Sequence, residues 1–177
     1  PGDKEVHVYR GIAYAALPVG DLRWQPPQPA ESWSGIRECT VFSMAAPQLH
    51  KEGGPIANIP ISEDCLYLNV YTAAKTHSAK LPVMVWMHGG GYVEDWGNNP
   101  TYTRGLALAQ HGVVLVTVNM RLGAIGLLGH PLLTAEQGGV SGNYMFLDMI
   151  ASLQWVQRNI AEFGGDPGNV TIFGESG

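Results

Sequence analysis

The sequence predicts an α/β fold in which a central, mostly parallel β-sheet is flanked by helices. Apolar strand-like runs alternate along the chain with stretches of helical period, which is the order of βαβ units. The run VVLVTV at 113–118 has no regular polar alternation. Such a run is typical of a strand that is covered on both faces, as in a parallel sheet.

The individual strands follow from apolar runs that are bounded by Gly and Pro. Residues 5–10 alternate in the manner of a strand, and residues 18–29 form a Pro- and Gly-rich loop. Further strands are expected at 66–72, 83–88, 113–118 and 170–173. The last of these is expected to be buried.

Two helices are expected between the strands. The shorter covers 104–111 and ends at Gly112, whereas the longer covers about 142–162, with Ser141 as its N-cap and Gly164 after its end. Its polar residues, Asp148 and Ser152 among them, are expected away from the core. Its apolar stripe is predicted to contain Phe146, Met149, Ile150, Leu153, Val156 and Ile160.

Composition limits the class of function. The 177 residues are 45% hydrophobic and 14% charged, with a net charge of −5, which is typical of a globular protein. They contain no Lys/Arg cluster to follow a nucleic-acid backbone and no apolar stretch long enough to span a membrane, while a cytoplasmic and a secreted location both remain open. Cys39 and Cys65 lack metal-binding spacing, so no metal is expected, and the sequence does not decide whether they pair.

The chain ends in Gly174-Glu175-Ser176-Gly177, directly after a β-branched run. These residues match the start of the G-x-S-x-G pattern, in which a sharp turn after a strand strains the backbone at the Ser and exposes its hydroxyl. Small neighbours are needed two positions away, since bulky ones would collide with the turn. Ser176 is therefore the predicted nucleophile, and an ordinary turn of small residues is the less favoured interpretation.

A second motif, His88-Gly89-Gly90-Gly91, follows the expected strand at 83–87. Consecutive glycines allow backbone N–H groups to face a substrate with no Cβ in the way. When a Ser attacks an ester carbonyl, the oxygen becomes negative and needs preorganised donors. We therefore expect the N–H groups of Gly90, Gly91 and Gly177 to form an oxyanion hole, in preference to a flexible glycine hinge.

With these motifs placed, the chain resembles the type-B carboxylesterases, a family that includes cholinesterases and some fungal lipases. The likeness extends over nearly the whole chain, and its most specific strings are EDCLYLNV at 63–70 and FGGDPGNVTIFGES at 163–176. The resemblance implies an α/β-hydrolase fold. Residues 1–177 are then expected to be the N-terminal portion of one catalytic domain that continues after Gly177.

The resemblance also implies hydrolysis of small-molecule carboxylic esters through an acyl-enzyme on Ser176, with no cofactor. In the family, the acid and the His of the triad follow the nucleophile. All the histidines of this sequence precede Ser176, namely His7, His50, His77, His88, His111 and His130. The remaining part of the same protein is therefore the expected partner that supplies both groups.

Residues beside the two motifs receive narrower predictions. Tyr92, Val93 and Trp96 are candidates for the wall of the substrate pocket, because they follow the glycines. His88 is expected to be a structural hydrogen-bonding residue. Glu175 is either an electrostatic group near the catalytic base or a buried, hydrogen-bonded turn residue.

Two other classes of protein are alternatives. A catalytically silent adhesion or scaffold protein of cholinesterase-like fold is the main one, although relatives of that kind often lose the nucleophile or alter the glycine motif, and both are intact here. A dinucleotide-binding module is disfavoured, because Gly123, Gly126 and Gly129 do not have G-x-G-x-x-G spacing. Ester hydrolysis is the function that the sequence favours.

Overall fold

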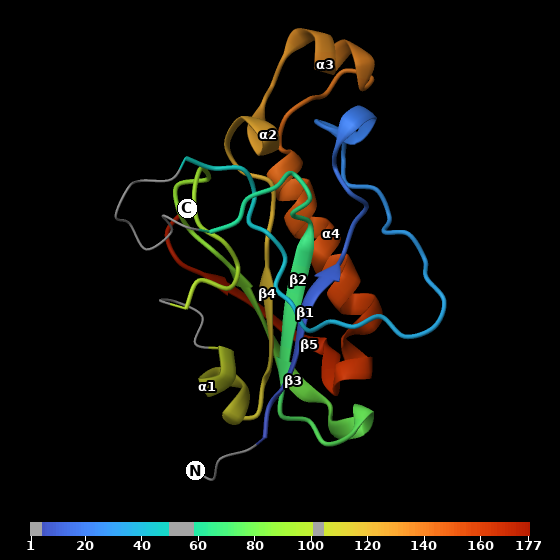
Figure 1. The fold of residues 1–177 in the computed structure, drawn as a ribbon, viewed down its shortest axis with the longest axis vertical. Coiled ribbons are helices and arrows are strands. Elements are labelled where there is room, and N and C mark those ends of the chain that lie inside the picture. The colour runs from blue at the N-terminus through green and yellow to red at the C-terminus, as the bar shows by residue number, and fades with distance from the viewer. Residues whose placement is uncertain (1–4, 50–58, 101–104) are drawn as a thin grey trace.

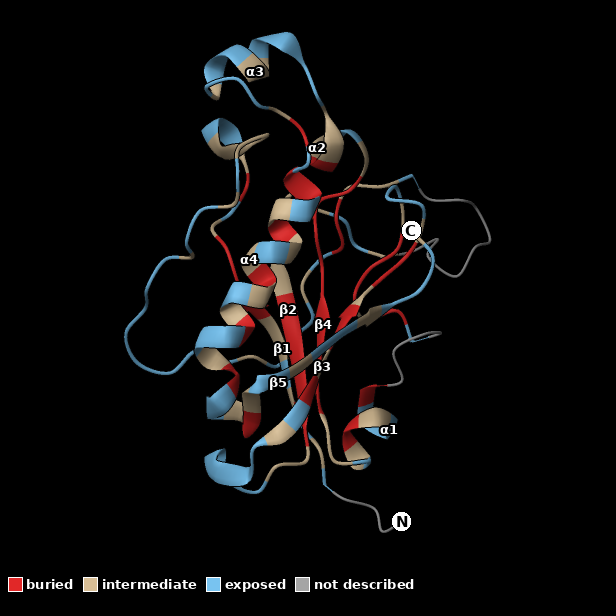
Figure 2. Cartoon of the chain, turned by 180° about the vertical axis from the view of Figure 1, so that it is seen from behind, coloured by how far each residue is buried: buried red, intermediate tan, exposed pale blue. Residues whose placement is uncertain are grey.

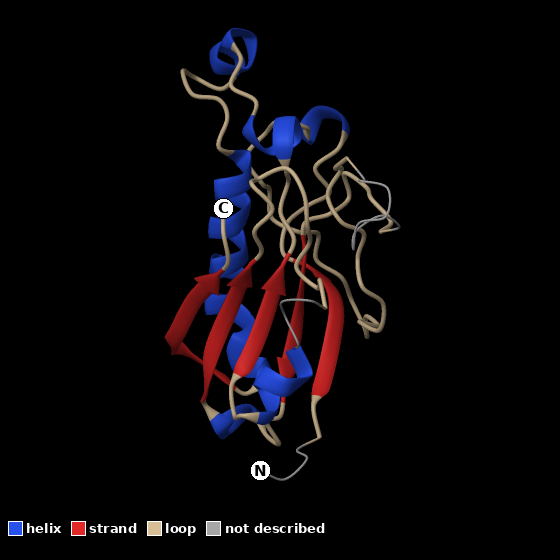
Figure 3. Cartoon of the chain, turned by 90° about the vertical axis from the view of Figure 1, so that its left-hand side faces the viewer, coloured by secondary structure: helices blue, strands red, loops and turns tan. Residues whose placement is uncertain are grey.

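A computed structural model describes residues 5–49, 59–100 and 105–177 of the chain. Five strands form one sheet in the order β1-β2-β4-β3-β5. Their bounds are His7–Ala13 (β1), Tyr67–Thr72 (β2), Leu81–Met87 (β3), Val114–Val118 (β4) and Gly165–Gly174 (β5). The long helix α4 lies across one face of this sheet and the short helix α1 lies against the other (Figures 1 and 3).

The described helices vary greatly in length. They are α1 (Gly105–Gln110), α2 (Gly123–Leu127), α3 (Pro131–Glu136) and α4 (Tyr144–Asn159), with short 3₁₀ helices at Gly20–Leu22, His77–Ala79 and Ile160–Phe163. The predicted helix at 104–111 is confirmed as α1, although Arg104 lies outside the described residues. As predicted, Gly164 follows the end of the long helical segment, where its backbone is left-handed with φ 77°.

The sheet is mixed rather than mostly parallel. β4 and β5 each pair in parallel with β3, whereas β2 is antiparallel to both β1 and β4. The prediction was based on apolar runs, which report burial on both faces but not strand direction. β2 is almost entirely buried in an antiparallel setting, so its sequence looks like that of a parallel strand.

β4 forms the centre of the fold, and all five of its residues are buried, as its sequence predicted. Val114, Val116 and Val118 belong to the large apolar cluster that also includes Met145 and Val156 of α4. On the other face, Leu115 packs with Ala109 of α1 and with Trp86 of β3. The core therefore has two layers, which fix the sheet from both sides.

The predicted core face of the long helix is wrong in part. Phe146 and Ile150 were placed in the apolar stripe, yet 41% and 51% of their surfaces are exposed. The buried residues of α4 are Tyr144, Met145, Asp148, Ser152 and Val156. Asp148 faces inward because it forms an ion pair with Arg121 at 2.7 Å, and neither side chain has any exposed surface.

The start of α4 also differs from the prediction. The helix begins at Tyr144, and its N-cap is Asn143 in a left-handed conformation rather than Ser141. The hydroxyl of Ser141 instead lies 2.6 Å from that of Thr134. Ser141 therefore makes a hydrogen bond to α3 and does not cap the long helix.

β5 is longer than expected and more exposed. It covers Gly165–Gly174, pairs with β3 alone among the described strands, and leaves 56% of Ile172 exposed. Figure 2 shows this strand and the outer face of α4 in tan and pale blue beside the red core. The prediction of a buried strand at 170–173 is therefore wrong for the described part of the protein.

Candidate active site

The two predicted motifs lie side by side because they follow neighbouring parallel strands. Met87, the last residue of β3, pairs with Gly174, the last residue of β5. The chain then continues into the glycine motif from β3 and into the Ser176 turn from β5. Loops that follow the carboxyl ends of parallel strands gather at one edge of a sheet, which is the usual place for a site in an α/β fold (Figure 3).

The Ser176 turn has the strained geometry that the sequence predicted. Ser176 has φ 58°, a left-handed conformation that a residue with a side chain rarely adopts. A Cβ added to Gly174 would lie 2.5 Å from the carbonyl oxygen of Met87, so no side chain fits there. The turn thus needs a small residue two positions before the Ser, and Ser176 itself is exposed.

Ser176 lies against the first glycine of the motif. A Cβ added to Gly89 would lie 3.0 Å from the Cβ of Ser176 and 2.5 Å from the carbonyl oxygen of Glu175. A hydrogen bond joins the two loops a little further on, where the N–H of Tyr92 donates to the carbonyl of Gly177 at 3.2 Å. The glycine motif and the Ser176 turn therefore form one compact unit.

The glycines are followed by a tight turn. Gly90 and Gly91 have φ 97° and 59°. The carbonyl of Gly90 accepts hydrogen bonds from the N–H groups of Val93 at 3.1 Å and Glu94 at 3.2 Å. Gly91 is exposed, and a Cβ there would meet nothing within 4 Å. The backbone beside Ser176 thus turns sharply, with open space at Gly91, the last glycine of the motif.

His88 supports this loop, as expected. Its side chain is 5% exposed, and its Nδ1–H donates to the carbonyl of Gly89 at 2.9 Å. Burial lowers the pKa of His88, while the hydrogen bond to Gly89 and the charge of Asp95 oppose that change. The ring is therefore a neutral hydrogen-bond donor at neutral pH.

The family model that describes the carboxylesterase family matches residues 1–177. The chain belongs to the carboxylesterase family. This confirms the resemblance inferred from the two motifs and their flanking strings. The glycine motif and the Ser176 turn therefore belong to a family whose name describes ester cleavage.

Individual relatives agree with this assignment. The chain is 50% identical over 175 residues to a fumonisin B1 esterase of Sphingopyxis macrogoltabida, covering 97% of this chain and 32% of that protein. It is 48% identical over 183 residues to liver carboxylesterase 1 of Oryctolagus cuniculus, covering 97% and 31%. The solved structure of a PNB esterase matches with a TM-score of 0.84 at 41% identity, covering 97% and 34%. The chain thus spans about a third of the length of these relatives.

The three pocket-wall candidates differ in exposure. Tyr92 and Val93 are 42% and 57% exposed, whereas Trp96 is 9% exposed and packs in a small cluster with Ala45. The ring of Tyr92 meets Phe146 of α4 edge-on, with 6.0 Å between centroids. Phe146 was assigned to the core from its helical spacing, and no local signal placed it beside the glycine loop.

Glu175 is exposed in the described part of the protein, so this part alone does not bury it as a turn residue. Its carboxylate oxygen Oε2 lies 2.9 Å from the position of a Cβ added to Gly89. The side chain therefore leans over the glycine motif from the neighbouring turn. Its role near a catalytic base stays a prediction.

Three further features concern the cysteines, metal binding and the length of the helices. Cys39 and Cys65 are both free thiols. In the described ranges, no cluster of three or more His, Cys, Asp or Glu side chains is arranged to hold a metal ion. None of the helices in those ranges has the length and apolar character needed to cross a bilayer.

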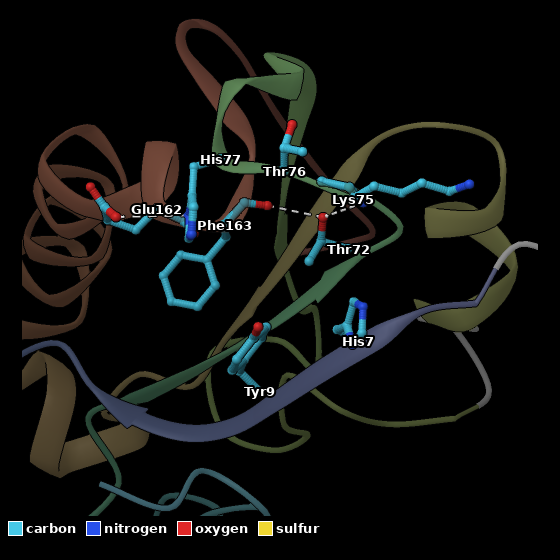
Figure 4. A pocket seen from close by; sticks show the side chains of 9 residues that line it. His7, Tyr9, Thr72, Lys75, Thr76, His77, Glu162 and Phe163 are labelled. Carbon is cyan, nitrogen blue, oxygen red and sulfur yellow. Dashed lines mark hydrogen bonds and ion pairs between the residues drawn. The ribbon is translucent and has the colours of Figure 1, made fainter. Parts of the chain in front are cut away.

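A separate surface hollow lies at the other end of the sheet from the glycine motif, beside the start of β1 and the end of β2 (Figure 4). His7 and Thr72, which line it, pair at the start of β1 and the end of β2. The hydroxyl of Thr72 donates to the carbonyl of Phe163 at 3.0 Å, and His77 contacts the carbonyl of Glu162. This hollow is remote from Ser176 and does not belong to the candidate active site.

Proposed function

We propose that the protein is a serine carboxylic-ester hydrolase in which Ser176 is the nucleophile. The N–H groups of Gly90, Gly91 and Gly177 form its oxyanion hole. The chain described here is part of one catalytic domain, and the triad acid and His come from the rest of the same protein. Small-molecule carboxylic esters are the substrates.

The contact between Ser176 and the glycine motif carries this proposal. Ser176, an exposed residue with a strained backbone, lies directly beside the glycine motif, where a Cβ added to Gly89 would be only 3.0 Å from the Cβ of Ser176. A carbonyl attacked by Ser176 would place its oxygen near the backbone of that turn. The relatives named above, a fumonisin B1 esterase and a liver carboxylesterase among them, support ester cleavage as the reaction.

The chemistry follows from these positions. The Oγ of Ser176 attacks the ester carbonyl carbon while a His outside this chain accepts its proton. The oxygen of the tetrahedral intermediate becomes negative, and the three N–H groups stabilise it. Collapse of the intermediate expels the alcohol, which takes the proton from the His. A water molecule then attacks the acyl-enzyme by the same route, which releases the acid and regenerates Ser176.

Labelling with a fluorophosphonate tests the nucleophile. In the full-length protein we expect the probe to modify Ser176, and Ser176→Ala to lose both the label and hydrolysis of p-nitrophenyl acetate by about 10³-fold or more. Ser34→Ala is the matched control, because Ser34 is an exposed serine in a loop of the same chain. It should label and turn over like the wild type.

The same labelling and hydrolysis experiment also tests the alternative function. A folded full-length protein that neither reacts with the probe nor hydrolyses the ester would be the catalytically silent adhesion or scaffold protein. Peptide mapping by mass spectrometry identifies the labelled residue. A label on a serine other than Ser176 would contradict the assignment of the nucleophile while leaving esterase activity intact.

A further inference from the structure

The side chain of Gln48, from a distant part of the sequence, holds Asp95, which lies just after the turn that follows the glycine motif. The N–H of Asp95 donates to Oε1 of Gln48 at 2.7 Å. In return, Nε2 of Gln48 donates to the carbonyl of Asp95 at 3.0 Å. The amide of Gln48 thus satisfies both backbone groups of one residue, as a neighbouring strand would.

Asp95 itself is held in an unusual conformation. It has φ 88° and is 6% exposed, so its left-handed backbone lies inside the protein. Its Oδ1 accepts hydrogen bonds from the N–H of Trp96 at 2.7 Å and from Nδ2 of Asn99 at 2.9 Å. Contacts to both the backbone and the side chain therefore fix Asp95 and offset the cost of its conformation.

The position of Asp95 determines the position of Gly90. A Cβ added to Gly90 would lie 2.1 Å from the carbonyl oxygen of Glu94, the residue directly before Asp95. The N–H of Glu94 also donates to the carbonyl of Gly90 at 3.2 Å. The two ends of the turn are thus in direct contact, and a shift of Asp95 would be transmitted to Gly90.

Gln48 is well anchored for this purpose. Its Nε2 lies 3.1 Å from the carbonyl of Ala46, to which it also donates. The neighbouring Ala45 is fully buried, donates to Pro60 at 2.9 Å and accepts from Ser62 at 2.9 Å. Gln48 therefore extends from a segment that is itself held by hydrogen bonds, so its contact with Asp95 keeps that residue in place.

We propose that Gln48 is a positioning residue for ester hydrolysis. Through the backbone of Asp95 it holds the glycine turn so that the N–H groups of Gly90 and Gly91 point at the developing oxyanion. This inference rests on the proposed function. Gln48 does not touch the substrate, so its effect appears in the transition state rather than in substrate binding.

Two substitutions in the full-length protein separate the parts of this contact. Gln48→Met keeps the length of the side chain and removes both hydrogen-bonding atoms. Gln48→Glu keeps an acceptor for the N–H of Asp95 and loses the amide donor. The matched controls are Gln157→Met and Gln157→Glu, because Nε2 of Gln157 likewise donates to a backbone carbonyl, that of Pro167 at 2.9 Å, at the other end of the sheet.

Turnover is measured per active site, with sites titrated by a fluorophosphonate, so that unfolded protein is not counted. We expect kcat to fall about tenfold to a hundredfold for Gln48→Met and less for Gln48→Glu, with KM changed less than about threefold. The inhibition constant of a trifluoromethyl ketone, which Ser176 converts to an oxyanion adduct, should rise by the same factor as kcat/KM falls. Both Gln157 variants should behave like the wild type.

A purely structural role predicts a different result. In that case the Gln48 variants would have fewer titratable sites or a lower melting temperature, while kcat per site and the inhibition constant stayed at the wild-type values. That result would overturn the proposal, and the Gln48→Glu variant decides the question if Gln48→Met does not fold. A wild-type protein that fails to react with the fluorophosphonate would overturn the proposed function as well.

Discussion

Ser176 combines an exposed hydroxyl with a backbone that most residues avoid. A left-handed conformation at a residue with a side chain costs about 1–3 kcal/mol, so the surrounding structure must hold it in place. Here the support comes from the pairing of β5 with β3 up to Gly174, from the close packing on Gly89, and from the hydrogen bond between Tyr92 and Gly177. The strain at one residue is therefore balanced by contacts from the neighbouring loop.

His88 gives this loop a dependence on pH. Burial lowers its pKa in the folded protein, whereas in the unfolded chain the ring takes up a proton below about pH 6.5. The unfolded state thus binds more protons, and stability falls as the pH drops below that value, by up to about 1.4 kcal/mol per pH unit from this group. In His88→Gln this contribution should vanish, as measured by urea unfolding of the full-length protein between about pH 5 and 7.

The matched control for this experiment is His111→Gln, since His111 is exposed just after α1. It should keep the wild-type dependence of unfolding free energy on pH. Identical pH profiles for the wild type and His88→Gln would show that the buried ring does not titrate as its surroundings suggest. The hydrogen bond to the carbonyl of Gly89 favours the protonated form and would be the first cause to examine, followed by the charge of Asp95.

At the scale of elements, the sequence located most strands and helices but not all their faces. β4 was predictable because five buried residues in a row leave a continuous apolar run. The buried face of α4 was not, since Asp148 looks like a surface residue until Arg121 is known to meet it. Those two residues are 27 positions apart, and helical periodicity within α4 carries no information about such a partner.

The candidate site, too, was only partly predictable from the sequence. The glycine motif and the Ser176 turn were found because steric requirements of a sharp turn restrict several adjacent residues at once. Gln48 and Asp95 have no such local pattern, and they meet across 47 positions of sequence. The supporting contacts of the site therefore emerge from the tertiary structure alone, whereas its reactive parts are visible in the sequence.

The ion pair that orients α4 yields a prediction at this scale. Asp148 accepts hydrogen bonds from Nε, Nη2 and the backbone N–H of Arg121 at 2.9, 2.7 and 3.1 Å. Asp148→Asn would leave a fully buried guanidinium without its charge partner, and we expect a loss of about 3–5 kcal/mol in unfolding free energy. Urea unfolding of the full-length protein measures this loss.

A partly exposed ion pair of the same chain is the matched control. Arg23 and Glu63 pair with side chains 39% and 24% exposed, so Glu63→Gln should cost about 0–1 kcal/mol. The double substitution Arg121→Met with Asp148→Leu should recover much of the loss, because it removes both buried charges. If Asp148→Asn costs no more than Glu63→Gln, the buried pair does not orient the helix.

For the whole molecule, the outer side of β5 is the most informative surface. β5 pairs with β3 on one side, and 56% of the apolar Ile172 is exposed. Phe146 and Ile150 on α4 are also exposed. Apolar strands at the edge of a sheet tend to pair with further chain or to aggregate. Because the chain spans about a third of its relatives, we predict that the rest of the protein covers β5.

Substitution of Ile172 by Asp tests this prediction in the full-length protein. If further chain packs on β5, the substitution buries an unpaired charge and should cost several kcal/mol, about 2–5, in unfolding free energy. Ile36→Asp is the matched control, because Ile36 is 98% exposed on a loop, and its effect should stay within about 0.5 kcal/mol. Equal and small effects of the two substitutions would mean that β5 is an outer strand of the complete protein, and that Ser176 lies at the rim of its sheet rather than near the middle.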